Sequence, residues 1–296
     1  MDSPHGAAVR AENLGLKGPY GWAFRGVDVD AEPGALIAVE GPSGSGRTCL
    51  LLALTGRMRT SEGHAEVAGF RLPGKPAEVR RISALGPVPG VSELDPALTV
   101  DEHLRERVLL QRRYSGSLRA LLRPRSERRA AARSRIGTAL EAAGLDPATL
   151  PKQGRTSVRD LERLEALRLS VALGLLGGPR LLAVDDADLK LSGPERDAAW
   201  ELLRSVAASG VTTLAVCSSA PEGAVTVSTR PAADRADTAD ARQQKTNARQ
   251  KNAQQAAQPQ DEPQKSTQTE KGAETVKDTG TEQEGAADAL AETGRP

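Results

Sequence analysis

The chain has 296 residues, enough for one or two domains, and its 40 lysines and arginines nearly balance its 39 aspartates and glutamates. Such a balance does not favour a nucleic-acid partner, so no specific nucleic acid is expected. No stretch approaches the roughly eighteen consecutive apolar residues of a membrane span, and the N-terminus lacks the apolar core of a signal peptide. Two cysteines without a paired motif are typical of a reducing compartment, and three scattered histidines give no metal-binding spacing. We therefore expect a soluble, cytoplasmic protein.

The N-terminal part of the chain alternates short strands and turns and leads into a glycine loop. Residues 26–34 (GVDVDAEPG) alternate apolar and polar side chains before a turn, which predicts an exposed strand. Residues 35–40 (ALIAVE) predict a buried strand, and residues 48–56 (TCLLLALTG) predict an apolar helix closed by a glycine. Two further short strands are expected at 64–70 and 81–86.

Helical patterns dominate the middle of the chain, from Val100 to Leu176. Strands return at 180–186 (RLLAVDD) and 211–218 (VTTLAVCS). The helix between them begins at Ser192-Gly-Pro-Glu195, a capping box with a proline in the first turn. This order of elements predicts an α/β sheet with an inserted helical subdomain at about residues 95–178.

The composition changes abruptly near residue 230. Residues 231–296 contain no aromatic side chain, and their only large aliphatic side chains are Val276 and Leu290. Such a segment cannot bury enough apolar surface to offset the entropy of ordering it. We therefore predict a folded domain at residues 7–230 followed by a disordered, low-complexity tail at residues 231–296.

The glycine loop at residues 41–48 (GPSGSGRT) matches the phosphate-binding pattern G-x-x-x-x-G-K-[ST], except that an arginine stands in the lysine position. The predicted strand before it and helix after it are the context that the motif requires. Glycines let the backbone wrap a phosphate chain, the helix N-terminus attracts anions, and the threonine hydroxyl suits magnesium. A guanidinium keeps the positive charge but not the reach of lysine. The alternative is a Gly/Ser turn that caps a core helix. The candidate nucleotide-binding residues are Gly41, Ser43, Gly44, Gly46, Arg47 and Thr48.

Two carboxylates end the buried strand at residues 180–186. Acids at the end of such a strand place a magnesium ligand beside the phosphate loop of α/β nucleotide enzymes. We expect Thr48 and Asp185 to bind Mg²⁺, and Asp186 to be the catalytic carboxylate that faces the attacking water. A plain acidic turn is the alternative for this pair. Combined with the glycine loop, the pair predicts a P-loop NTPase sheet that binds ATP with Mg²⁺.

From about residue 8 to residue 220, the chain resembles the nucleotide-binding cassette of ABC transporters. Residues 32–72 resemble the family's Walker A segment through the following strand, and residues 94–104 (LDPALTVDEHL) resemble the stretch after its Q-loop. Residues 171–192 (VALGLLGGPRLLAVDDADLKLS) are similar to the end of the signature helix, Walker B and the D-loop. The resemblance implies an aromatic side chain that stacks on adenine, either Tyr20 or Trp22; Tyr20 is our candidate.

The departures from the family pattern are systematic. The resemblance places Gly90 at the Q-loop glutamine and Leu161-Glu162-Arg163-Leu164-Glu165 at the LSGGQ signature, although a shift to residues 156–160 restores a serine. Asp186 takes the place of the catalytic glutamate and is one methylene shorter. Two further functional positions also change, with Ser218 at the switch histidine and Ser192 at the D-loop aspartate. Together these changes predict a cassette that binds nucleotide and hydrolyses it poorly.

The resemblance implies an ATP-binding subunit of an ABC-type transport system, with hydrolysis that is weak or depends on a partner cassette. The implied partners are a separate transmembrane permease subunit and a second cassette in a homo- or heterodimer. The protein would then be cytoplasmic, and peripheral at the inner face of the membrane through its partner. The alternative is a non-catalytic nucleotide-binding regulatory or scaffold protein that keeps the cassette fold.

One feature lies outside these motifs. From Arg105 to Arg135 the sequence has eleven arginines and two glutamates. A basic amphipathic helix can lie on anionic lipid, grip phosphates or dock a membrane partner. The alternative is a solvated helical surface in an arginine-favouring sequence. The single aromatic residue of the stretch, Tyr114, is little for stacking nucleic-acid bases.

Overall fold

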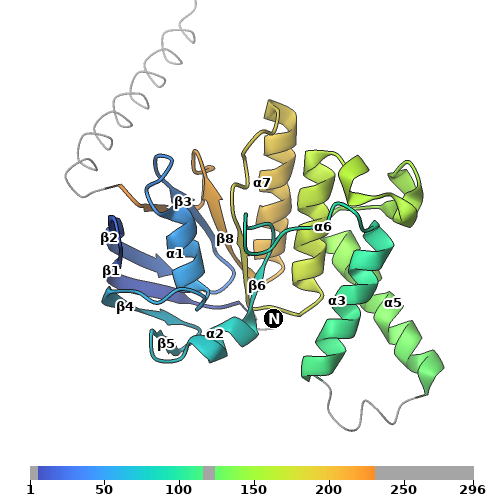
Figure 1. The fold of residues 1–296 in the computed structure, drawn as a ribbon, viewed down its shortest axis with the longest axis horizontal. Helices are drawn as coiled ribbons and strands as arrows, with labels where there is room; N and C mark the ends of the chain where they lie inside the picture. The colour runs from blue at the N-terminus through green and yellow to red at the C-terminus, as the bar shows by residue number, and fades with distance from the viewer. Residues whose placement is uncertain (1–5, 116–123, 231–296) are drawn as a thin grey trace, which may run out of the picture. The chain divides into compact units, whose positions relative to one another are not determined.

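Two β-sheets with different strand directions form the centre of the fold. The computed structural model describes residues 6–115 and 124–230 (Figure 1). An antiparallel sheet has the strand order β2-β1-β4-β5, and a parallel sheet has the order β6-β7-β8-β3-β9. The strands are β1 (Val9–Gly18), β2 (Gly21–Ala31), β3 (Leu36–Glu40), β4 (Glu62–Val67), β5 (Phe70–Leu72), β6 (Ser83–Leu85), β7 (Leu181–Val184), β8 (Thr212–Cys217) and β9 (Val225–Ser228).

The parallel sheet is buried on both faces, which explains why its strands are continuously apolar. Side chains that alternate along a strand point to opposite faces. On β7, Leu181 and Ala183 therefore pack in the core that contains α1 and the antiparallel sheet. Leu182 and Val184 pack in a second core, on the face covered by helices α6 and α7. The α/β architecture predicted from the sequence is confirmed.

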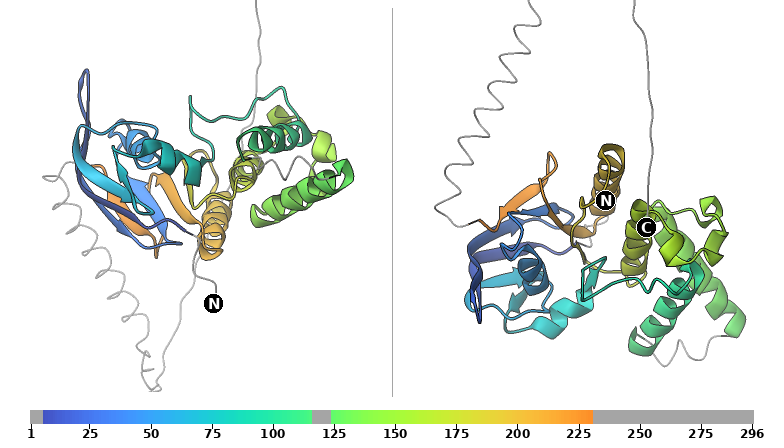
Figure 2. Two further views of the ribbon diagram at one scale, coloured as in Figure 1. Left: turned by 90° about the horizontal axis from the view of Figure 1, so that it is seen from below. Right: turned by 45° about the horizontal axis from the view of Figure 1, so that its top comes forward.

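The helices fall into two groups. Helix α1 packs between the two sheets, and α2 contacts β5 and β6. Helices α3, α5 and α6 lie together on the side away from β1 and β2, as Figure 2 shows. The helix bounds are α1 (Arg47–Leu54), α2 (Pro76–Ile82), α3 (Val100–Ser115), α5 (Arg125–Ala142), α6 (Arg163–Leu175) and α7 (Gly193–Ala208), with short 3-10 turns at Pro147–Thr149, Gln153–Arg155 and Val158–Asp160.

The capping box predicted at the start of α7 is present. The Ser192 backbone N–H donates to the Glu195 carboxylate at 2.8 Å, and the Ser192 hydroxyl donates to it at 2.6 Å. The first of these bonds satisfies a backbone N–H at the helix start that has no partner within the helix. Helix α7 therefore begins where the sequence indicated.

Three predicted strands differ in the structure. The strand expected at 26–34 is β2, which begins at Gly21 and ends at Ala31, and it is not exposed throughout because Val27 and Val29 are buried. The strand expected at 64–70 is a hairpin, because Ala68 and Gly69 have φ angles of 52° and 83° and turn the chain between β4 and β5. The strand expected at 81–86 starts at Ser83, after helix α2. Strands β1 and β9 and helix α2 were not predicted. The segment 231–296, predicted to be a tail, lies outside the described residues. In the parts of the chain that the structure covers, we find no helix with both the length and the apolar character of a membrane span.

Candidate functional site

The glycine loop joins β3 to α1 in the conformation that its glycines permit. Gly44 and Gly46 both have φ of 79°, in the left-handed region that other residues rarely adopt. A Cβ atom at Gly46 would collide with the backbone carbonyl of Ala23 on β2, whereas a Cβ at Gly44 would meet no atom within 4 Å. Gly46 is therefore required for the close approach of loop and sheet, and Gly44 lies at an open part of the loop. The loop residues Pro42, Ser43 and Gly44 are exposed.

The next residue, Arg47, does not lie free in the loop. Its Nη1 donates a hydrogen bond of 2.7 Å to the carbonyl oxygen of Cys217, at the end of β8. A charged donor makes a stronger bond than a neutral one. To contact a phosphate, the guanidinium would have to break this hydrogen bond or bind the phosphate through its other N–H groups while keeping it.

Thr48 and Asp185 meet in the site, although 137 positions separate them in the sequence. The Thr48 hydroxyl donates to Asp185 Oδ2 at 2.7 Å, and the Asp186 backbone N–H donates to Asp185 Oδ1 at 3.0 Å. Asp185 is only 3% exposed. Burial raises the pKa of its carboxyl group and the nearby charge of Asp186 adds to this, while the bond from Thr48 opposes it.

Asp186 adopts an uncommon backbone conformation, with φ of 49°. Aspartate tolerates this left-handed region better than most residues. Its side chain lines the same cavity as Asp185. The predicted catalytic carboxylate and the predicted magnesium ligand, which are consecutive in the sequence, thus line one cavity.

A third carboxylate, Asp188, was not singled out in the sequence. It is 8% exposed and accepts bonds of 3.1 and 3.0 Å from the Ser218 backbone N–H, and one of 3.4 Å from the Ser218 hydroxyl. These bonds connect the loop after β7 to Ser218, the residue that follows β8 and is matched to the family's switch histidine. The sequence feature that could have pointed to Asp188 is the run of three aspartates in Asp185-Asp186-Ala187-Asp188.

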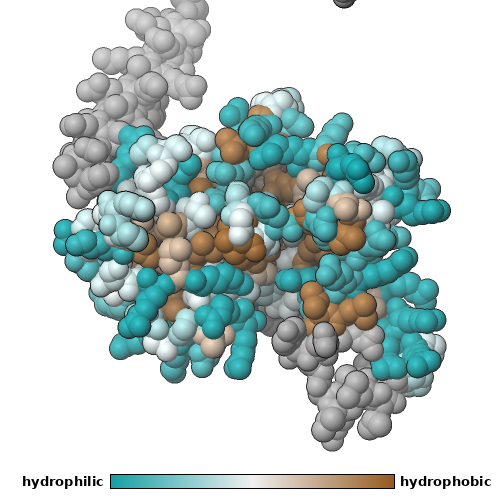
Figure 3. Space-filling model, in the orientation of Figure 1, coloured by the Kyte–Doolittle hydropathy of each residue, from teal (hydrophilic) through white to brown (hydrophobic). Residues whose placement is uncertain are grey.

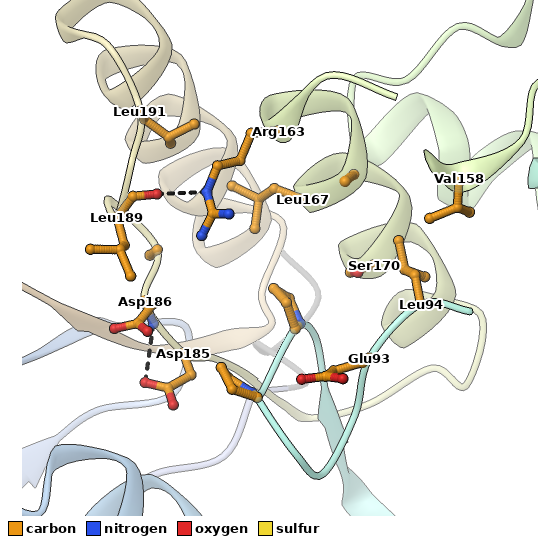
Figure 4. Close-up of a pocket in the computed structure, with 14 residues that line it drawn as sticks. Glu93, Leu94, Val158, Arg163, Leu167, Ser170, Asp185, Asp186, Leu189 and Leu191 are labelled. Atoms are coloured by element: carbon orange, nitrogen blue, oxygen red, sulfur yellow. Dashed lines mark hydrogen bonds between the residues drawn. The ribbon is translucent and has the colours of Figure 1, made fainter. Parts of the chain in front are cut away.

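A cavity of about 230 Å³ lies beside the Asp185–Asp186 pair (Figure 4). Leu94, Val158, Leu167 and Leu191 contribute to its apolar lining. Its polar groups come from three segments, and they are Glu93 from the loop after β6, Arg163 and Ser170 from α6, and Asp185 and Asp186 from the loop after β7.

The loop after β6 carries no amide side chain at the position matched to the Q-loop glutamine. Gly90 stands there with φ of 72°, and its N–H donates to Glu93 Oε1 at 2.8 Å. The acidic side chain that faces the cavity is therefore held within its own loop. Sequence comparison pointed to the missing glutamine but not to Glu93.

Helix α6 begins at the residues matched to the signature. Glu162 is the N-cap, and its N–H donates to Glu165 Oε2 at 2.9 Å within a capping box. Arg163 Nε donates to the carbonyl oxygen of Leu189 at 2.7 Å, which links α6 to the loop after β7, as Figure 4 shows. Two carboxylates and one arginine side chain thus occupy the helix start.

The two candidate aromatic side chains differ in their surroundings. Tyr20 is fully exposed in the turn between β1 and β2. The ring of Trp22 has the Arg25 guanidinium 4.5 Å from its centroid and the Lys17 ammonium at 5.8 Å. Part of the Trp22 ring surface is therefore already used in cation–π contacts.

The residues present fit a magnesium ion that is bound mainly through phosphates. Among the residues that the structure describes, no group of three or more histidine, cysteine, aspartate or glutamate side chains is arranged to hold a metal. Thr48 and Asp185 supply one hydroxyl and one carboxylate oxygen side by side. Magnesium commonly takes one or two such protein ligands together with substrate phosphates and water.

Comparison with known proteins gives matches over the region that contains these residues. The family model for "ABC transporter" matches residues 24–188, more than half of the chain. A Nod factor export ATP-binding protein I from Cupriavidus pinatubonensis is 31% identical over 188 residues, which cover 64% of this chain and 51% of the relative. The protein of the same name from Ralstonia nicotianae is 30% identical over 202 residues, covering 68% and 56%. The chain thus spans about half the length of these curated relatives.

Solved structures show the same fold at lower identity. The dimeric ATP-binding cassette MJ0796, in a post-hydrolysis state bound to ADP and Pi, matches with a TM-score of 0.55 at 20% identity, covering 72% of this chain and 88% of that chain. The protein cbiO1 from Clostridium perfringens, part of the ABC transporter complex cbiONQ, matches with a TM-score of 0.54 at 16% identity, covering 72% and 79%.

Proposed function

The chain belongs to the ABC transporter family, and on this premise we propose that it is the ATP-binding subunit of an ABC-type transport system, with hydrolysis that is weak or depends on a partner cassette. The observation that carries the proposal is the 2.7 Å bond between Thr48 and Asp185. It joins the phosphate-loop motif to the acidic strand end, and it places a hydroxyl and a carboxylate where the Mg²⁺ of a bound nucleotide would need them.

Nucleotide binding in this proposal uses the loop and its flanking groups. The backbone N–H groups around Gly44 and the N-terminus of α1 hold the phosphates, and Thr48 and Asp185 hold Mg²⁺. Arg47 contributes its charge after it leaves the Cys217 carbonyl. Tyr20 is the better candidate for stacking on adenine, because the Trp22 ring already contacts two cations. The remaining proposed binding residues are Gly41, Ser43 and Gly46.

Weak hydrolysis is inferred from the groups around the cavity. A signature loop binds the γ-phosphate of the nucleotide on a partner cassette through small residues and a serine. Here Glu162 and Glu165 place negative charge at the start of α6, and the Arg163 side chain reaches across to Leu189. Like charges repel, so this helix start is unsuited to a phosphate. Asp186 then remains as a short catalytic carboxylate.

The partners in this proposal are a transmembrane permease subunit and a second cassette. A second copy of this chain would carry the same altered signature, so in this proposal the second cassette is one with an unaltered signature, which it supplies to the nucleotide bound here. The protein works at the inner face of the cell membrane through the permease. The curated relatives are named for Nod factor export; we make no assignment of a transported substrate.

The alternative is a regulatory or scaffold protein that binds nucleotide without turnover. The internal bonds of the altered motifs favour it, since Gly90 bonds within its own loop and Arg163 and Ser218 each bond to another segment of the chain. Binding that persists without phosphate release, even beside a competent cassette, would select this alternative.

Calorimetric titration of the full chain with Mg-ATP, followed by phosphate release on the same sample, tests the proposal. We expect saturable binding and slow release. Asp186→Asn is the matched control without the catalytic carboxylate, and Asp186→Glu restores the longer side chain and is expected to raise the release rate. No binding at millimolar ATP would refute the nucleotide site. Rapid release by the unaltered chain, abolished in Asp186→Asn, would refute weak hydrolysis.

A further inference from the structure

The surface of α3 and α5 carries an arrangement of charges that the proposed nucleotide site does not use. Arg125, Arg129 and Arg133 follow one another at four-residue intervals on α5, and all three are exposed. Residues spaced this way are neighbours on one helix face, where like charges destabilise the helix. None of the three has an ion pair or hydrogen bond to any described residue. The helix thus keeps an unfavourable row of cations that is not neutralised by any residue in the described ranges.

The row borders a groove between α3 and α5, of about 740 Å³. Leu104, Val108, Leu109 and Ile136 contribute its apolar lining, and Arg105, Arg129 and Arg133 contribute its charge. Leu109 is 57% exposed, and the adjacent Leu110 is 40% exposed. Figure 3 shows the apolar area over α3 with hydrophilic side chains over α5 beside it.

Charge within the groove is unbalanced. Among the described residues that line it, the one acidic side chain is Asp101, which lies 3.5 Å from Arg105 and pairs with it. Arg129 and Arg133 therefore face the groove without a carboxylate. Guanidinium groups bind phosphate oxygens in pairs and stay charged at every physiological pH. The chemistry that complements this surface is anionic, and it includes an apolar part.

We propose that the α3–α5 surface binds an anionic phospholipid bilayer, with Arg125, Arg129 and Arg133 on the headgroup phosphates and Leu109 inserted between headgroups. A basic side chain row beside exposed leucines is the pattern of interfacial membrane binding. Nucleic acid fits less well, because no aromatic side chain lines the described part of the groove for base stacking. This contact is separate from a permease and needs no nucleotide.

Vesicle co-sedimentation of the full chain tests the proposal. The vesicles contain either phosphatidylcholine alone or phosphatidylcholine with phosphatidylglycerol. We expect binding only to the anionic vesicles, and weaker binding as the salt concentration rises. Each arginine near an anionic surface contributes roughly fivefold to partitioning, so the triple variant Arg125→Gln, Arg129→Gln, Arg133→Gln is expected to bind about 100-fold more weakly.

A matched control removes the same number of charges elsewhere. Arg59, Arg81 and Arg196 are exposed and form no ion pair in the described part of the chain. The variant Arg59→Gln, Arg81→Gln, Arg196→Gln should keep most of the binding. Replacing the three α5 arginines with lysine should also keep most of it, while Leu109→Ser should weaken it without changing the dependence on salt.

Four results would overturn the proposal. They are equal binding to neutral vesicles, no binding to anionic vesicles, an equal loss in the two triple variants, and a larger effect of the α5 variant on binding to labelled duplex DNA than on binding to vesicles. Each of these results is independent of the Mg-ATP titration, so failure here is distinguishable from failure of the proposed nucleotide site.

Discussion

Two substitutions at Asp185 separate its structural role from its proposed role in metal binding. Asp185→Ala removes the acceptor of two hydrogen bonds, at 2.7 Å from Thr48 and 3.0 Å from the Asp186 N–H. Each such bond contributes about 1 kcal/mol, so the free energy of unfolding should fall by about 2 kcal/mol. Asp185→Asn keeps one acceptor oxygen and removes a buried charge, and should stay within about 1 kcal/mol of the unaltered protein.

Both variants should lose the magnesium-dependent part of ATP binding to a similar extent. Substitution of a residue that only supports a metal ligand already lowers metal affinity by about tenfold or more. The loss of Mg-dependent ATP affinity at Asp185 should therefore be at least about tenfold. Urea unfolding gives the stability, and calorimetric titration with ATP in Mg²⁺ or in EDTA gives the binding. In EDTA, the unaltered protein and Asp185→Asn should bind ATP alike.

Two results would refute this reasoning. If Asp185→Asn weakens ATP binding equally in Mg²⁺ and in EDTA, Asp185 acts on the nucleotide site without holding the metal. If Asp185→Ala unfolds at the same urea concentration as Asp185→Asn, the hydrogen bond that asparagine retains contributes nothing measurable.

Three further outcomes are expected. Gly46→Ala should destabilise the protein by at least about 1 kcal/mol, because a φ of 79° is strained for alanine and the alanine Cβ would collide with the Ala23 carbonyl. An unchanged unfolding midpoint would contradict this. Gly44→Ala, which has the same φ but an open position, is the control that isolates the steric collision. Because burial raises the pKa of Asp185 above its unfolded value, its carboxyl group takes up a proton at a higher pH than an ordinary aspartate. Protonation then favours the folded state, and Mg-dependent ATP affinity should fall as the pH drops through this range; the same affinity down to the ordinary aspartate pKa would show that Asp185 is not the ligand. Burial raises the pKa of the Cys217 thiol to about 12, and the charges of a nearby aspartate and glutamate add to this rise. Iodoacetamide at pH 8 should therefore leave Cys217 unmodified in the folded chain, as measured by mass spectrometry. Labelling at the rate of a free thiol would show that Cys217 is accessible and ionised.

The sequence by itself determined the local part of the site. The glycine loop, the apolar strand before it and the acids after residue 184 are short-range patterns whose chemistry depends on spacing along the chain. Their glycines and alternating apolar residues leave few other conformations, so the loop, β3, β7 and the cap of α7 were predicted close to their observed limits. The general placement of acids beside the phosphate loop in α/β nucleotide enzymes then predicted that Thr48 would meet Asp185, a contact across 137 positions that no local pattern encodes.

Only the tertiary structure shows which hydrogen-bond partners the residues in and around the altered motifs have. Arg47 bonds to the Cys217 carbonyl, Asp188 holds Ser218, and Arg163 reaches Leu189. The first two contacts join segments that are adjacent because parallel strands bring their carboxyl ends to one edge of the sheet. The third joins the start of α6 to the loop after β7. The same holds for the α3–α5 surface, where the sequence showed an excess of arginines. Only the arrangement of the two helices showed that Arg129 and Arg133 face an apolar groove, where no carboxylate of residues 6–115 or 124–230 pairs with them.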